Sequence, residues 1–161
     1  MKNKNFLRYI ILLVGIMSFC FAANAQNRLL SDMPSGRGVS KVYLSKELIK
    51  LGGGATAQAT AAGRYMAYVK DMDGIEAYNC INPQLRESVE SRFRKIIRSS
   101  KAEELLSSED SFESSYIYLV NNSKKGGSSA MIIYNSSPQE IDIIVIHGKI
   151  DPSAVKILPT Y

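Results

Sequence analysis

The chain has 161 residues, of which 20 are basic and 15 acidic, and its formal net charge is +5. This length holds one domain with a single core, and without the three basic residues of the first 25 positions the net charge falls to +2, which argues against a nucleic-acid partner. One histidine and two cysteines leave no Cys/His metal motif and no disulfide framework.

The first 25 residues have the pattern of a signal peptide. Three basic residues precede an apolar run over residues 9–21, and Ala23 and Ala25 are small residues where a signal peptidase reads them. The run is shorter than the roughly 20 residues of a membrane span. We therefore expect cleavage after Ala25, a mature chain with net charge +2 and no transmembrane segment, and a periplasmic or secreted location.

Lipid anchoring at Cys20 is the competing interpretation of this leader. Lipidation of a cysteine requires a small residue directly before it, and here the bulky Phe19 precedes Cys20. We therefore expect no lipid anchor. Cleavage leaves Cys80 as the single cysteine, either as a buried apolar residue or as an exposed, redox-active thiol.

Residues 26–38 are polar and without periodicity, which predicts a flexible lead-in, and residues 39–161 form a single α+β domain. Residues 39–51 can start extended and continue as a short helix, because Leu44, Leu48 and Leu51 recur at helical spacing. The path of residues 52–68 stays open.

A long amphipathic helix begins at Asn82 and Pro83, a capping residue followed by a proline in the first turn. Its apolar face carries Val89 and Phe93. Its polar face carries four basic residues that either form an ordinary solvated surface or meet an acidic partner: Arg92, Arg94, Lys95 and Arg98. Leu105 and Leu106 continue this helix or form a separate turn.

Four strands are predicted, over residues 75–81, 112–120, 129–134 and 141–147. The last is the most apolar and should be central in the sheet. Asp151 and Pro152 predict a short C-terminal helix. The fold class is therefore α+β: a mainly antiparallel four-stranded sheet, one long helix across one face, and short N- and C-terminal helices.

His147 is the single histidine, and no serine shows a nucleophile-elbow pattern. It is either a strand-edge histidine bonded to the backbone or the base of a hydrolase that uses a carboxylate such as Asp142 or Asp151. No cofactor and no metal site are expected, because the chain has no complete set of ligands.

Tyrosines on neighbouring strands are the candidate binding residues. Tyr116 and Tyr118 project from one face of their strand, with Tyr134 on the next strand. If that face is open, it suits a protein or glycan partner; if the helix covers it, the rings are ordinary cross-strand packing.

Two motifs carry a family resemblance: Val-Tyr-Leu-Ser-Lys at residues 42–46 and Gly-Lys-Ile-Asp at residues 148–151. With the order of the elements, they resemble domain-of-unknown-function family 4252, small exported proteins of Gram-negative bacteria, over residues 39–158. Residues 52–63 are richer in glycine and alanine than that family's pattern. The resemblance implies an export signal and an α+β fold, and no activity.

The sequence thus favours an exported, non-enzymatic envelope protein that binds another envelope protein or a cell-surface glycan. A hydrolase that uses His147 with carboxylates is one alternative. A regulatory protein of envelope stress with a redox-active Cys80 is the other.

Overall fold

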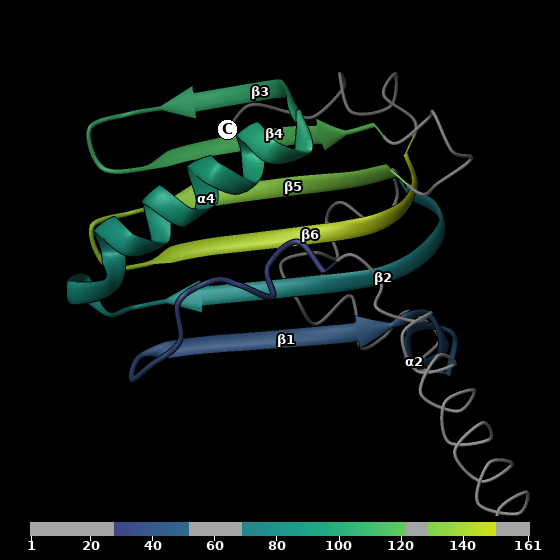
Figure 1. The fold of residues 1–161 in the computed structure, drawn as a ribbon. Coiled ribbons are helices and arrows are strands. Elements are labelled where there is room, and N and C mark those ends of the chain that lie inside the picture. The colour runs from purple at the N-terminus through teal and green to yellow at the C-terminus, as the bar shows by residue number, and fades with distance from the viewer. Residues whose placement is uncertain (1–27, 52–68, 122–128, 151–161) are drawn as a thin grey trace, which may run out of the picture.

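Six antiparallel strands form one sheet in the computed structural model, which describes residues 28–51, 69–121 and 129–150 (Figure 1). The strand order is β1-β2-β6-β5-β4-β3, and each neighbouring pair is antiparallel. The strands are β1 (Val39–Ser45), β2 (Val69–Cys80), β3 (Glu103–Glu109), β4 (Ser114–Val120), β5 (Ser129–Ser136) and β6 (Ile141–Ile150). The helices are α2 (Lys46–Leu51), the 3-10 turn η4 (Pro83–Leu85) and α4 (Arg86–Ser100).

The α+β class and the antiparallel sheet are confirmed, but the prediction of four strands is wrong. The two additional strands, β1 and β3, are the edges of the sheet. Leu105 and Leu106 lie in β3 rather than in a helix or turn. The helix ends earlier because Lys101 adopts a left-handed conformation (φ 51°) and Ala102 donates its N–H to the Ile97 carbonyl.

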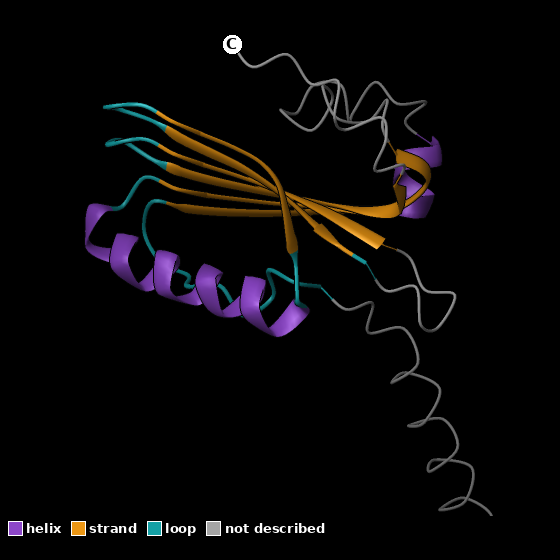
Figure 2. Ribbon diagram, turned by 90° about the horizontal axis from the view of Figure 1, so that it is seen from above, coloured by secondary structure: helices purple, strands orange, loops and turns teal. Residues whose placement is uncertain are grey.

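The start of the long helix follows the predicted capping. The Asn82 side chain accepts a hydrogen bond from the Gln84 N–H at 3.0 Å, and Pro83 opens η4, which leads into α4. Val89 and Phe93 are buried beneath α4, as the apolar stripe predicted. Figure 2 shows α4 lying against one face of the sheet, which we call the helix-covered face; the opposite face is the second face.

Strand β6 is central and sends apolar side chains to both faces, which confirms its predicted place. Ile143 and Val145 join the core under α4, while Ile144 and Ile146 join a separate apolar cluster on the second face. A strand whose two faces are both buried needs apolar side chains on each of them, which explains the continuous apolar run of β6.

Residues 28–34, which we call the N-terminal strap, pack against the helix-covered face. Leu30 and Met33 are buried there in the same core as α4. The sequence predicted a lead-in at this position and gave no sign of these buried side chains. The leader, residues 52–68 and the predicted C-terminal helix from Asp151 lie outside the described residues. Within the described ranges, no helix has the length and apolar character needed to cross a membrane.

Candidate functional site

A buried carboxylate on β2 holds the N-terminal strap. Glu76 is 4% exposed, and its two oxygens accept the backbone N–H groups of Leu29 at 2.8 Å and Leu30 at 2.9 Å. His147 Nε2 lies 2.7 Å from the same oxygen that Leu29 contacts. A carboxylate is stable inside a protein only when its oxygens are bonded, and these three groups bond both of them.

Further contacts fix the strap along its length. The Tyr78 hydroxyl donates to the Pro34 carbonyl at 3.0 Å, and Lys41 Nζ donates to the Met33 carbonyl. Asp32 forms an ion pair with Arg92 of α4, with 2.9 Å between Oδ2 and the guanidinium nitrogen. The strap is therefore a fixed wall that faces α4 rather than a free extension.

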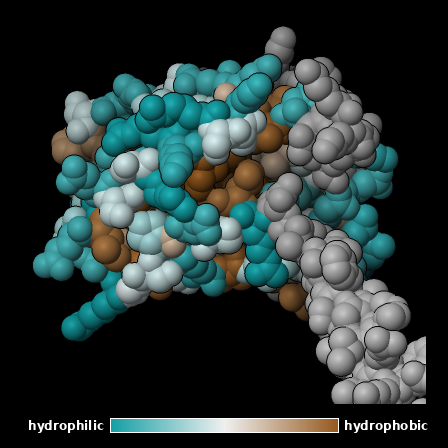
Figure 3. All heavy atoms as spheres, in the orientation of Figure 1, coloured by the Kyte–Doolittle hydropathy of each residue, from teal (hydrophilic) through white to brown (hydrophobic). Residues whose placement is uncertain are grey.

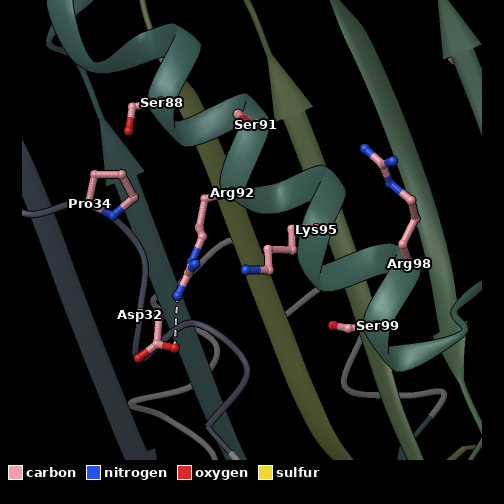
Figure 4. A pocket seen from close by; sticks show the side chains of 8 residues that line it. All are labelled: Asp32, Pro34, Ser88, Ser91, Arg92, Lys95, Arg98 and Ser99. Carbon is pink, nitrogen blue, oxygen red and sulfur yellow. Dashed lines mark hydrogen bonds and ion pairs between the residues drawn. The ribbon is translucent and has the colours of Figure 1, made fainter.

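An open groove of about 940 Å³ lies between the strap and α4. Figure 4 shows Arg92 reaching across it to Asp32, and Lys95 on the same side of the helix. The strap supplies two of the lining residues and α4 the others: Asp32, Pro34, Ser88, Ser91, Arg92, Lys95, Arg98 and Ser99. Hydroxyl and cationic groups thus line the helix side of the groove.

The groove carries an excess of positive charge. Arg92, Lys95 and Arg98 follow one another at three-residue intervals, which spans about 9 Å of helix. Asp32 neutralises Arg92, whereas neither Lys95 nor Arg98 forms an ion pair with any other residue of the described part.

Apolar side chains gather near the middle of this face of the molecule, ringed by hydrophilic ones (Figure 3). The surface is suited to a ligand that combines negative and apolar groups.

The three candidate tyrosines lie on the helix-covered face. Tyr134 is 7% exposed and stacks on Phe93 of α4, with ring centroids 4.4 Å apart. Tyr118 meets Phe93 edge-on at 6.0 Å and stacks on Tyr116, also at 6.0 Å. Burial raises the pKa of Tyr134 and of Tyr118. The condition for an open aromatic surface is not met, and the rings form cross-strand packing under α4.

Tyr116 lies at the outer end of this aromatic row. Its hydroxyl bonds to the Glu109 carboxylate of β3, and this bond raises the pKa of Tyr116 to about 12. Tyr116 therefore links β4 to the edge strand of the sheet.

His147 pairs with Glu76 rather than with the carboxylates that the sequence suggested. Asp142 bonds instead to the Asn79 amide at 2.8 Å, and Asp151 lies outside the described residues. Residues 28–51, 69–121 and 129–150 hold no group of three or more His, Cys, Asp or Glu that could bind a metal ion. Glu76 and His147 thus support the strap. Side chains alternate along β2, so Glu76 lies on the same face as Tyr78 and Cys80. This alternation is the sequence signal from which the inward position of Glu76 could have been predicted.

Cys80 is 3% exposed, and its thiol donates to the Asn82 carbonyl at 3.7 Å. This agrees with the interpretation of Cys80 as a buried apolar residue. The redox-active alternative requires an exposed thiol, which the folded domain does not present.

One family model matches most of the chain. Its description is "Domain of unknown function (DUF4252)", and the match covers residues 35–158. It includes the six strands and α4, and it begins directly after the strap. No curated protein and no solved structure matches the chain.

Proposed function

Because the chain belongs to the DUF4252 family of unknown function, we propose a function from its own geometry: an exported, non-enzymatic binding module of the cell envelope. Its partner is an envelope protein with an acidic segment, which binds in the groove between α4 and the N-terminal strap. Export rests on the signal-peptide pattern of residues 1–25.

The cationic wall of the groove is the observation that supports this function. Lys95 and Arg98 lack acidic partners within the described residues, and Ser88, Ser91 and Ser99 add hydroxyl groups beside them. Carboxylates that meet such a wall form charge-assisted hydrogen bonds, and because Lys95 and Arg98 are exposed, each such ion pair contributes about 0–1 kcal/mol, so that binding needs several of them together. The geometry favours an acidic protein segment over a neutral glycan, because the aromatic rings that would stack on a sugar are packed under α4.

Asp32 occupies part of this site. Its carboxylate is bonded to Arg92, yet its side chain is 73% exposed. An exposed ion pair of this kind contributes about 0–1 kcal/mol, so an incoming acidic group can replace Asp32 on Arg92. Asp32→Ala is therefore expected to strengthen binding of the acidic partner.

Crosslinking in cells tests the proposal. The tagged full-length precursor is crosslinked, purified and analysed by mass spectrometry, together with Lys95→Glu and Arg94→Glu. Lys95 lines the groove, whereas the exposed Arg94 is adjacent on α4 and does not.

We expect one dominant envelope protein with the wild type and with Arg94→Glu, and its loss with Lys95→Glu. Equal recovery with both variants would exclude the groove as the binding site. The same sample tests export, because the processed protein should begin at Gln26.

A further inference from the structure

The two edges of the sheet differ in how they resist pairing with another strand. At one edge, β3 has a bulge between Glu104 and Leu106 and carries exposed glutamates at 103, 104 and 109. Bulges and charges are the usual devices that prevent edge-to-edge association. At the other edge, β1 pairs with β2 in an unbroken register over all seven residues, and its one charged residue, Lys41, donates its ammonium group to the Met33 carbonyl of the strap. The β1 edge, which lies at the opposite side of the sheet from β3 (Figure 1), therefore has less protection than the β3 edge.

Exposed apolar side chains gather along the β1 edge. Five large hydrophobic residues are exposed within the described ranges, and four lie there: Val42, Leu48, Leu51 and Ile81. Val42 is at the centre of β1 and is 49% exposed. Leu48 and Leu51 lie in α2, which follows β1, and Ile81 lies at the opposite end, where its N–H bonds to the Gly38 carbonyl at 2.9 Å. Such a concentration of apolar surface is typical of an interaction site.

These side chains also share one side of the sheet. Val42 is paired with Ala77, and Ile81 directly follows β2, four residues after Ala77, so the alternation of the strand directs both side chains to the second face. Ile49 of α2 packs into the second-face core, which places α2 on that side as well. The exposed apolar residues therefore form a border between the second face and the β1 edge.

We propose that β1 pairs antiparallel with β1 of a second copy of this chain, about a twofold axis that passes beside Val42. The two six-stranded sheets then form one continuous sheet. The hydrogen bond from the Ile81 N–H to the Gly38 carbonyl makes these two residues a hydrogen-bonded pair, and such pairs alternate along two antiparallel strands. The N–H and C=O groups of Val42 therefore point toward β2, whereas those of Lys41 point away from the sheet. When the two β1 strands are paired about Val42, residues whose main-chain N–H and C=O groups point outward lie opposite one another and can form hydrogen bonds between the two copies.

The twofold axis makes the apolar border complementary to itself. The two Val42 side chains meet as a non-hydrogen-bonded pair, in which Cβ atoms are about 4.5–5.5 Å apart. Because the strands are antiparallel, α2 of one copy lies toward the Ile81 end of the other. Leu48 and Leu51 are thereby directed toward Ile81 of the second copy, once at each end of the joined strands.

Sedimentation velocity of the mature protein over a concentration series tests this pairing. The variants are Val42→Lys and Ser108→Lys; Ser108 is an exposed residue of the opposite edge strand that points to the same face. We expect a concentration-dependent dimer for the wild type and for Ser108→Lys. Val42→Lys should dimerise at least about tenfold more weakly, because each added charge loses its water at the axis. A wild type that stays monomeric at the highest attainable concentration would overturn the proposal.

Disulfide trapping gives a second test that does not depend on the lysine variant. Cys80 is buried, so cysteines introduced by Val42→Cys or Ser108→Cys are the accessible thiols of the mature chain. Mild oxidation should yield a covalent dimer for Val42→Cys and not for Ser108→Cys. No covalent dimer from Val42→Cys, or equal yields from both variants, would exclude the Val42-centred register.

Discussion

Glu76→Gln tests how the N-terminal strap is held. The carboxylate of Glu76 accepts from Leu29, Leu30 and His147 at 2.7–2.9 Å inside the protein. A glutamine of the same shape has one acceptor oxygen, and its amide nitrogen must then face at least one of the two backbone N–H groups. An unpaired buried donor costs about 1–3 kcal/mol, and the remaining bonds lose their charge assistance, so we expect a loss of about 2–4 kcal/mol.

Chemical denaturation gives the free energy of unfolding, and native-state hydrogen exchange locates the change. A loss of 3 kcal/mol lowers the melting temperature of a domain of this size by roughly 10 °C. The amides of Leu29 and Leu30 should lose more protection than those of the central strand β6. Glu103→Gln, at an exposed position of β3, should change stability by less than about 0.5 kcal/mol. Unchanged protection of Leu29 and Leu30 in Glu76→Gln would refute the reasoning.

Three further predictions concern the core. Gly148→Ala would place its Cβ 2.7 Å from Val69 Cγ1 and 3.0 Å from the Asp71 carbonyl oxygen, so urea titration should show a loss of about 1–3 kcal/mol; wild-type stability would contradict this packing. Burial raises the pKa of Tyr78 to about 12, above the unfolded value of about 10. The fold thus favours the neutral phenol, and stability present below pH 10 should decline up to about pH 12, less steeply in Tyr78→Phe; equal slopes would contradict this assignment. Cys80 should react with a thiol reagent far more slowly in the native than in the denatured protein; equal rates would restore the redox-active alternative.

Regular patterns in the sequence predicted the parts of the fold that rest on local rules. Asn82 and Pro83 mark the start of α4 by their capping chemistry, and the stripe through Val89 and Phe93 gives the face that α4 buries. The apolar run of β6 predicts its central position, because only a strand covered on both faces omits the polar alternation. The suspected family was confirmed by the match over residues 35–158.

Features that depend on tertiary contacts were not predictable from the same patterns. Strand β3 was missed because Lys101 ends α4 in the left-handed conformation without the glycine that usually marks such an end. The strap is short, and its Leu30 and Met33 are apolar residues that follow no helix or strand period. The groove follows from the strap, so Asp32 and Pro34 could not be placed opposite α4 before the fold was known.

Binding of an acidic peptide to the groove tests the central claim most directly. Fluorescence anisotropy with a labelled oligoglutamate peptide compares the wild type with Lys95→Glu, the adjacent control Arg94→Glu, and Asp32→Ala. We predict saturable binding that weakens as salt rises, is lost in Lys95→Glu, persists in Arg94→Glu and strengthens in Asp32→Ala. Equal binding by Lys95→Glu and Arg94→Glu, or no binding by the wild type at low salt, would contradict the account.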